Sequence, residues 1–316
     1  MIDTLNFHLD LKEMDKTTFS KLMQRISITK QKIFHDRYGM EYVYFYGNIG
    51  HLKVILCKSR IFIKDRSICK WIKGDNLHTL NRKEIEDGID RLSDILHLPM
   101  DQAKVSRLDL GQNFIVQQPA ENYLSHLGIL SRAKRLCQFH GLYYNKTNLQ
   151  LIFYDKLKEY KQSNDKMPEQ YNNKYMLRYE LRLLQKLSSL LKVPEVTTGL
   201  LYNKDFYVNL VKLWHTYYKA IQKINDIDLN FDAIKNKKDL HRVAILNLLK
   251  DHNGEIEVTD QIDEALECRK LTSKQACDLK AIIIKASEIK KGFVTTNEAI
   301  KELNQKIDDF ASNEIS

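Results

Sequence analysis

Several features are missing from this 316-residue sequence, and each absence argues against a class of protein. No apolar run approaches the roughly 20 residues that a bilayer-spanning helix needs, so a membrane protein is not expected. Glycine contributes only 11 residues and neither GxxxxGK[ST] nor GxGxxG occurs, which argues against a nucleotide-dependent enzyme or a fused helicase. Residues 1–15 show alternation and acidic residues where a signal peptide would have a basic start and an apolar block, so a cytoplasmic protein is expected.

Cysteine is also scarce. The five cysteines are an odd number and include no CxxC pair, so neither a disulfide framework nor a zinc knuckle is indicated. We expect reduced thiols that mostly fill the core. They are Cys57, Cys69, Cys137, Cys268 and Cys277.

Basic charge, in contrast, is abundant. The chain carries 50 Lys and Arg against 41 Asp and Glu, for a formal net charge of +9 and a pI near 9.1. Such a balance favours a polyanionic partner, either nucleic acid or an anionic membrane surface. With 43% apolar residues the chain can also bury a substantial core, so a globular protein is expected.

The first part of the chain has a β-rich pattern with interspersed helices. A helix is expected to begin at the cap residue Asn81 and to end before Pro99, and another short helix should follow Pro119. A hairpin loop is expected at residues 47–50. Short runs rich in β-branched and aromatic residues predict strands at 2–9, 41–46, 52–57, 104–116, 142–144, 149–154 and 175–184.

Beyond about residue 187 the β signal fades and amphipathic helical segments take over. Helices are predicted over 206–224, 238–249, 259–268, 272–289 and 296–310. The expected fold is α+β, with an antiparallel-rich central sheet flanked by helices in a domain of residues 1–193. A mainly helical domain of residues 194–316, with a role in binding DNA or a partner, should follow.

Three of the predicted strands carry the candidate chemistry. Residues two apart in a strand share a face, so each run separates into an apolar side and a polar side. If these strands pair, the apolar sides form a buried face and the polar sides gather on the other. The gathered polar residues are Arg107 and Asp109 from RLDLG, Tyr154 and Lys156 from IFYDK, and Arg178, Glu180 and Arg182 from RYELR.

This set of side chains suits cleavage of a phosphodiester bond. A phenol with a reference pKa of about 10 needs nearby positive charge or a metal ion before it can attack phosphorus. Asp109 and Glu180 could hold such a divalent ion, while Arg107, Arg178 and Lys156 could add to the same field or position the strand. The same alternation is also typical of any solvated sheet face, and most strand tyrosines only pack, so the pattern by itself leaves both interpretations open.

The runs VSRLDLGQNF (105–114), LIFYDKLKE (151–159) and LRYELRL (177–183) resemble three ordered motifs of the filamentous-phage gene II/X replication proteins. Related plasmid initiators of the transposase-like Rep type share a similar order. The opening MIDTL and the stretch IDRLSDILHLP before the first motif also fit members of this family. The resemblance covers roughly residues 1–193 and implies a Rep nickase-like fold.

By this resemblance the protein is a rolling-circle replication initiator of a phage or plasmid. It would nick one DNA strand at the origin as an endonuclease and strand transferase, with a 5′-phosphotyrosine intermediate. Tyr154 would be the nucleophile, Lys156 its companion, and Asp109 and Glu180 the carboxylates that bind Mg²⁺ or Mn²⁺, with Arg107 and Arg178 preceding them as the family pattern expects. His140 is the candidate third metal ligand, although a lone histidine before a strand is more often a packing or surface residue.

Further basic residues flank the tyrosine motif. Arg132, Lys134, Arg135 and Lys158, together with Arg182, are predicted to hold the DNA backbone near the nick. Base contacts for origin specificity are expected from the N-terminal hairpin region and the helical domain. An aromatic cluster at 206–218 could stack on bases, but its helical spacing favours a role in the core.

The first implied partner is origin DNA, both as a duplex and as an exposed single strand. The others are a host helicase, a host polymerase and, in a homodimer, a second copy of the chain. A tyrosine recombinase is disfavoured because its tyrosine would come last, in a helical catalytic domain. The remaining alternative is a non-catalytic origin-binding or copy-control protein in which Tyr154 is only structural. A nicking assay separates these interpretations.

Overall fold

The computed structural model describes most of the chain. The described residues are 1–11, 16–64, 67–138, 141–162, 167–227, 231–232, 234–252, 254–288, 294–295 and 297–316.

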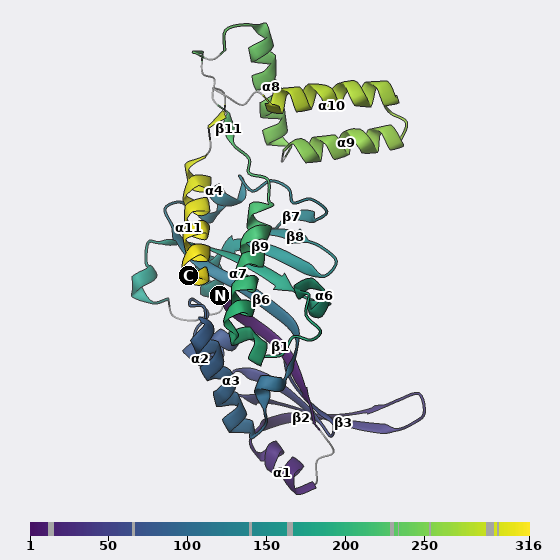
Figure 1. Ribbon diagram of the computed structural model, residues 1–316, viewed down its shortest axis with the longest axis vertical. Coiled ribbons are helices and arrows are strands. Elements are labelled where there is room, and N and C mark those ends of the chain that lie inside the picture. The colour runs from purple at the N-terminus through teal and green to yellow at the C-terminus, as the bar shows by residue number, and fades with distance from the viewer. Residues whose placement is uncertain are drawn as a thin grey trace.

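A ten-stranded sheet forms the centre of the molecule (Figure 1). Its strands lie in the order β2-β3-β4-β5-β1-β6-β10-β9-β8-β7, and every neighbouring pair is antiparallel. The strands are β1 (Ile2–Asp10), β2 (Ser27–His35), β3 (Glu41–Ile49), β4 (Leu52–Cys57), β5 (Arg60–Lys64), β6 (Lys104–Val116), β7 (Lys134–Gln138), β8 (Gly141–Asn145), β9 (Leu149–Asp155) and β10 (Tyr175–Leu183). The expected antiparallel, helix-flanked α+β architecture is therefore confirmed.

Helices precede, interrupt and follow the strands. In chain order they are α1 (Lys16–Gln24), α2 (Ile68–Lys73), α3 (Arg82–Leu96), α4 (Ala120–Leu124), α5 (Lys156–Gln162), α6 (Leu187–Leu191), α7 (Lys204–Lys219), α8 (Lys237–Asp251), α9 (Glu255–Glu267), α10 (Ser273–Glu288) and α11 (Glu298–Ile315). Short 3₁₀ turns occupy Met100–Gln102, Glu169–Tyr171 and Gly199–Tyr202. Among the described residues, none of the helices is both long enough and apolar enough to cross a bilayer.

The sequence signals at both ends of α3 operate as predicted. The Asn81 side chain accepts a hydrogen bond from the Glu84 amide, and the Glu84 side chain accepts one from the Asn81 amide, which forms a capping box. The helix ends at His97, which adopts a left-handed conformation with φ 52°, two residues before Pro99. Its apolar stripe is fully buried, and it includes Ile85, Ile89, Leu92 and Leu96.

One face of the central strands is apolar and is covered by helices. The Tyr179 ring of β10 stacks on Phe153 of β9 at 4.4 Å between ring centroids and on Trp214 of α7 at 4.7 Å. The Tyr179 hydroxyl also donates to the carbonyl of Trp214 over 3.0 Å, so this buried phenol is satisfied. Phe310 of α11 packs edge-on against Trp214 at 5.6 Å. The aromatic cluster of α7 is therefore part of the core, as its spacing indicated.

The helices predicted after residue 205 are all present, but they do not form one separate domain. The main hydrophobic cluster includes buried residues of α7 and α11 together with those of the sheet. A second, small cluster joins α8, α9 and α10, which lie apart from the sheet beyond the two-residue strand β11 (Asp226–Ile227) (Figure 1). The expected division between residues 193 and 194 falls inside the main core, because α7 and α11 supply the apolar surface that buries the central strands.

Two further details differ from the sequence expectations. β3 continues through Ile49, because Asn48 pairs with Lys53 and Ile49 with Leu52. The expected loop at 47–50 is therefore a tight turn at Gly50 and His51, where Gly50 has φ +57°. Strands β2, β5 and β7 were not predicted, since two of them are edge strands without apolar alternation.

Candidate active site

The register of β6, β10 and β9 brings the candidate residues onto one face of the sheet. Arg182 lies opposite Asp109 across β10 and β6, and Arg178 lies opposite Tyr154 across β10 and β9. Directly opposed residues of antiparallel strands point to the same side, so all four side chains share a face. Glu180, two residues from both arginines, is on it as well.

Glu180 is the centre of this cluster. Its Oε1 accepts hydrogen bonds from Arg178 Nε at 2.5 Å and from the Tyr154 hydroxyl at 2.9 Å. Its Oε2 accepts a hydrogen bond from Arg182 Nε at 2.8 Å and lies 2.7 Å from Arg182 Nη2 in the same ion pair. Burial alone would raise the pKa of this carboxyl, but Arg178 and Arg182 lower it to about 2. Glu180 is therefore ionised, and it holds the phenol of Tyr154 in place.

Asp109 is the second carboxylate of the cluster, and only 2% of it is exposed. Arg107 grips it with two hydrogen bonds, Nε to Oδ1 at 2.9 Å and Nη2 to Oδ2 at 2.7 Å. Burial raises the pKa of Asp109 to about 6, against the opposing effect of Arg107 and Arg182. Arg182 Nε lies 3.7 Å from Asp109 Oδ2, so Arg182 contacts both carboxylates.

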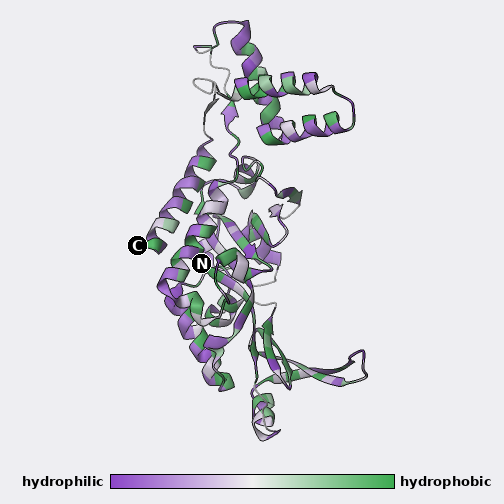
Figure 2. Ribbon diagram, turned by 45° about the vertical axis from the view of Figure 1, so that its right-hand side comes forward, coloured by the Kyte–Doolittle hydropathy of each residue, from purple (hydrophilic) through white to green (hydrophobic). Residues whose placement is uncertain are grey.

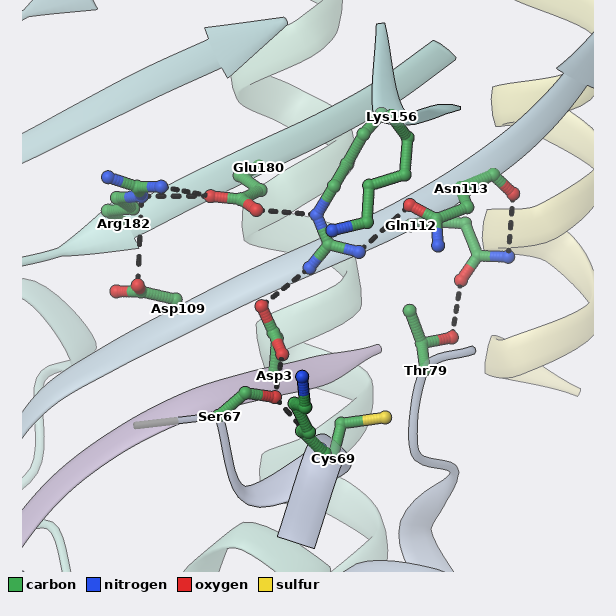
Figure 3. Close-up of polar contacts among 12 residues, drawn as sticks. Asp3, Ser67, Cys69, Thr79, Asp109, Gln112, Asn113, Lys156, Glu180 and Arg182 are labelled. Carbon is green, nitrogen blue, oxygen red and sulfur yellow. Dashed lines mark hydrogen bonds and ion pairs between the residues drawn. The ribbon is translucent and has the colours of Figure 1, made fainter. Parts of the chain in front are cut away.

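Arg178 is completely buried and is satisfied by several acceptors. Besides Glu180 it donates from Nη1 to Asn113 Oδ1 at 2.8 Å and from Nη2 to Asp3 Oδ2 at 2.7 Å. The Ser67 hydroxyl, at the N-terminus of α2, donates to the other oxygen of Asp3 at 2.5 Å. Figure 3 shows this chain of contacts, which runs from Asp109 through Arg182 and Glu180 to Asp3 and Ser67. Such a network fixes the position of Glu180, because its main partner cannot move independently.

Tyr154 is half-buried, at the wall of a cleft of about 570 Å³. The cleft also reaches Arg135, Lys158, Glu159 and Arg182. Burial and the adjacent charge of Glu180 both raise the pKa of the Tyr154 phenol well above its ordinary value of 10. The resting phenol is therefore protonated, and it donates its hydrogen to Glu180.

Lys156 is the first residue of α5, so it does not continue the strand of Tyr154 as the tyrosine-x-lysine pattern suggested. It nevertheless stays close, with its Nζ 5.8 Å from the centroid of the Tyr154 ring. The side chain is buried and donates to Glu159 Oε2 over 2.7 Å. Burial lowers the pKa of Lys156, and the neighbouring positive charge of Arg178 lowers it further.

Three residues of the site were not identified from the sequence. Asp3 and Glu159 pair with Arg178 and Lys156, and the opening MIDTL, noted for its resemblance to the family, was the only sequence signal for Asp3. Gly111 lies opposite Glu180, and a Cβ atom there would be 2.9 Å from Arg178 Nη2 and 3.0 Å from Glu180 Cγ. A glycine is needed at this position because the two side chains pass directly over its backbone.

Of the residues predicted to hold DNA, Arg135, Lys158 and Arg182 line the cleft. Lys134 is exposed on the edge strand β7, and Arg132 precedes it in a turn with φ 57°. Arg135 lines the cleft and donates to the Leu127 carbonyl at 3.2 Å. Lys158 lines it too, in an ion pair with Glu121. Arg182 lines the cleft as well, and it also belongs to the carboxylate cluster.

The two carboxylates of the cluster, Asp109 and Glu180, are the candidate ligands of a divalent cation. Within the described residues, no group of three or more His, Cys, Asp or Glu side chains is arranged to hold a metal ion. His140 lies outside the described residues. Asp109 and Glu180 supply hard carboxylate oxygens on the same face, which fits Mg²⁺ or Mn²⁺, since Mg²⁺ is usually held by one or two carboxylates together with water and substrate phosphate. In the structure, arginines occupy these oxygens.

Comparison with known proteins defines the class. A family model of the N-terminal region of the phage gene II replication-associated protein matches residues 1–216, which is more than half of the chain. No curated protein matches the sequence. The molecule is thus a replication-associated protein. More particularly, the chain belongs to the phage gene II-type replication initiator family, as the resemblance predicted, and DNA is its partner.

Proposed function

We propose that this initiator nicks one strand of DNA at a replication origin and becomes covalently attached to it through Tyr154. The observation that supports the proposal is the hydrogen bond from the Tyr154 hydroxyl to Glu180, on the sheet face that also carries Asp109 and three arginines. A phenol held at the wall of an open cleft, beside buried cationic groups, has the chemistry of a phosphate-directed nucleophile.

Each residue of the site would have a distinct role in cleavage of the phosphodiester bond. The Tyr154 oxygen attacks phosphorus, the bond from phosphorus to the 3′ oxygen breaks, and the 5′ phosphate remains on the tyrosine. Glu180 orients the phenol by accepting its hydrogen bond. The phenolic proton passes to solvent as the bond to phosphorus forms, and the departing 3′ oxygen takes up a proton from solvent to become a hydroxyl. Lys156 and Arg182 lie close enough to balance the negative charge of the phosphate.

Asp109 and Glu180 would hold Mg²⁺ or Mn²⁺ in this proposal. A bound divalent ion supplies Lewis-acid polarisation of the phosphate oxygens. The chain's own contribution is to keep both carboxylates ionised and aligned, which Arg107 and Arg178 do through their hydrogen bonds. Arg182 contacts both carboxylates, so it competes with a cation for the same oxygens.

The phosphotyrosine would conserve the phosphoester for a later strand transfer, and the released 3′ hydroxyl would prime a host polymerase. Strand separation would need a recruited host helicase, because the sequence has no phosphate-binding glycine loop. Arg135 and Lys158, which both line the cleft, would hold the DNA backbone near the nick.

A nicking assay tests the proposal. Purified protein with Mg²⁺ or Mn²⁺ should convert supercoiled DNA that carries its origin to the open circle and should become attached to labelled DNA. Tyr154→Phe should abolish both effects and leave DNA binding intact. Tyr143→Phe, whose phenol lines the same cleft, is the matched control and should retain activity.

If Tyr143→Phe abolishes nicking and Tyr154→Phe does not, Tyr143 is the nucleophile instead of Tyr154. If neither the wild type nor any variant nicks or attaches to origin DNA, the protein is a non-catalytic origin-binding or copy-control protein. Asp109→Asn and Glu180→Gln should each reduce cleavage and change its dependence on metal concentration. Circular dichroism of every variant controls for misfolding, since Glu180 also holds the buried Arg178 and Asp109 holds the partly buried Arg107.

A further inference from the structure

Aromatic side chains cover an exposed part of the sheet, on the face opposite the apolar core. Strands β2 and β3 form a hairpin that projects from the body of the molecule (Figures 1 and 2). Five aromatic rings and a lysine on β2, β3 and β5 line a hollow of about 460 Å³ at this hairpin. We name this the aromatic surface, and it consists of Phe34, Tyr42, Tyr44, Tyr46, Phe62 and Lys64.

The strand register places these residues on a single face. Phe34 lies opposite Tyr42, and Tyr46 lies opposite Ile55, which in turn lies opposite Phe62. Phe34 and Tyr42 are 46% and 49% exposed, which is unusual for large aromatic residues on the same face of a hairpin. The other face of β3 packs against α1, where Phe45 meets Phe19 at 6.1 Å between centroids. The fold therefore does not use the aromatic surface as core.

The same register connects the aromatic surface to the candidate active site. Phe62 lies opposite His8 of β1, with their rings 5.6 Å apart. Two residues earlier in β1, Asn6 lies opposite Arg107 of β6, which holds Asp109. The aromatic surface and Tyr154 thus occupy one continuous side of the sheet. Six strand spacings of about 4.8 Å separate β3 from β9, so the two lie roughly 30 Å apart along it.

Positive charge accompanies the rings. Residues 27–64 contain seven Lys and Arg but only two acidic residues, so this segment attracts a polyanion. Lys64 Nζ lies 4.9 Å from the centroid of Phe62, and Lys32 Nζ lies 5.7 Å from that of Tyr46. Rings with a cation beside them can stack on a base while the cation meets the adjacent phosphate.

We propose that the aromatic surface binds single-stranded DNA and guides the strand toward Tyr154, an inference that rests on the proposed nickase function. Single-stranded DNA is favoured over the duplex because aromatic rings stack only on bases whose faces are open, and the faces are covered inside a duplex. The bases would lie over Tyr42, Tyr44 and Phe62, with phosphates near Lys32 and Lys64.

Fluorescence anisotropy with a labelled oligodeoxythymidine of about 20 nucleotides tests this, because such an oligomer exceeds the usual site size of roughly 4–16 nucleotides. Phe34→Ala and Tyr42→Ala should each weaken binding by roughly 5- to 100-fold, the loss expected for one stacked base. Both side chains are exposed, so the variants should fold normally. Tyr42→Phe keeps the ring and should bind as the wild type does. Phe231→Ala, which removes a 69% exposed ring outside the sheet, should also bind normally.

Unchanged affinity in both alanine variants would overturn the inference. If the alanine variants lose as much affinity for a duplex of the same length, the preference for single strands is wrong. If they change the protein's mass in light scattering but keep their DNA affinity, the aromatic surface binds a second copy of the chain instead. The measurement is repeated in the Tyr154→Phe background, where ring-dependent binding should persist. A wild-type protein that binds through these rings but never nicks would refute the nickase proposal and leave DNA binding by the aromatic surface in place.

Discussion

Arg182 and Glu180 are joined at a single carboxylate oxygen, Oε2, by a hydrogen bond from Nε at 2.8 Å and an ion-pair contact with Nη2 at 2.7 Å. The same guanidinium lies 3.7 Å from Asp109 Oδ2, so one arginine contacts both carboxylates. A cluster that is balanced by arginine in this way can accept a divalent ion only if Arg182 gives up part of its contacts.

Arg182→Gln should therefore make cleavage respond to lower metal concentrations. We expect the Mg²⁺ concentration for half-maximal nicking to fall by roughly tenfold, which corresponds to about 1.4 kcal/mol of removed competition. The measurement is a metal titration of nicking. Arg135→Gln removes another arginine of the same cleft that does not contact the carboxylates, and it should leave the metal requirement unchanged. A higher metal requirement in Arg182→Gln would show instead that Arg182 supports metal binding.

Asp3→Ala should destabilise the protein, because Asp3 accepts a hydrogen bond from the fully buried Arg178. Loss of one partner from a buried ion pair commonly costs several kcal/mol, but Arg178 keeps Glu180 and Asn113, so we expect about 2 kcal/mol. Urea denaturation measures this. Asp10 is on the same strand as Asp3 and forms an exposed ion pair with Arg60 of β5. Asp10→Ala should lower the free energy of unfolding by less than about 1 kcal/mol. Equal effects of the two variants would contradict the structural role of Asp3.

Lys223 should give the stability of the protein a specific dependence on pH. Its Nζ donates to the carbonyls of Tyr218 and Ile221, both at 2.8 Å, and burial lowers its pKa from 10.5 to about 7. Between pH 7 and 10.5 the unfolded chain then binds a proton at Lys223 that the folded chain does not bind. The free energy of unfolding should therefore rise with pH from about 7 upward. Urea midpoints measured from about pH 6 to about pH 9 should show this rise, and Lys223→Met should flatten it. A rise of the same size in that variant would assign it to other groups.

The two-residue period of a strand is what allowed part of the site to be predicted from the sequence. Once 104–116, 149–154 and 175–184 are strands, alternation alone fixes that Asp109, Tyr154 and Glu180 oppose the leucines, and the structure places them on one face. Alternation does not distinguish a solvated face from a covered one. Asp109 and Glu180 are each only 2% exposed, and arginines pair with both of them.

The rest of the fold depends on long-range packing that no local pattern records. β2 is an edge strand whose residues are mostly exposed on both sides, so it lacks the alternation by which a strand is recognised. The pairing of β1 with β6, which brings Asp3 to Arg178, joins residues about 100 positions apart. The helical pattern after residue 205 predicted the helices correctly, but helical period alone does not show that α7 and α11 cover the sheet while α8, α9 and α10 pack on one another.

This last arrangement predicts that α8, α9 and α10 can be removed as a unit. The chain leaves the body at β11 and returns at β12 (Val294–Thr295), and these strands pair directly, with Asp226 opposite Thr295 and Ile227 opposite Val294. Replacement of residues 228–293 by Asn-Gly, which favours a two-residue hairpin turn, should therefore connect β11 to β12 without strain. The deletion breaks the partly exposed ion pair of Lys250 with Asp226 and uncovers Ile227, which packs against the cluster of α8, α9 and α10, so we expect a loss of about 2 kcal/mol.

Circular dichroism and urea denaturation measure the folding of this deletion variant, and cleavage of a single-stranded oligonucleotide that carries the nick site measures its activity. Both should be retained, since the hydrogen bonds and ion pairs described above for Tyr154, Asp109 and Glu180 join residues of the sheet strands. An unfolded deletion variant would show that the helical unit supports the sheet, and a folded but inactive one would show that it takes part in the reaction.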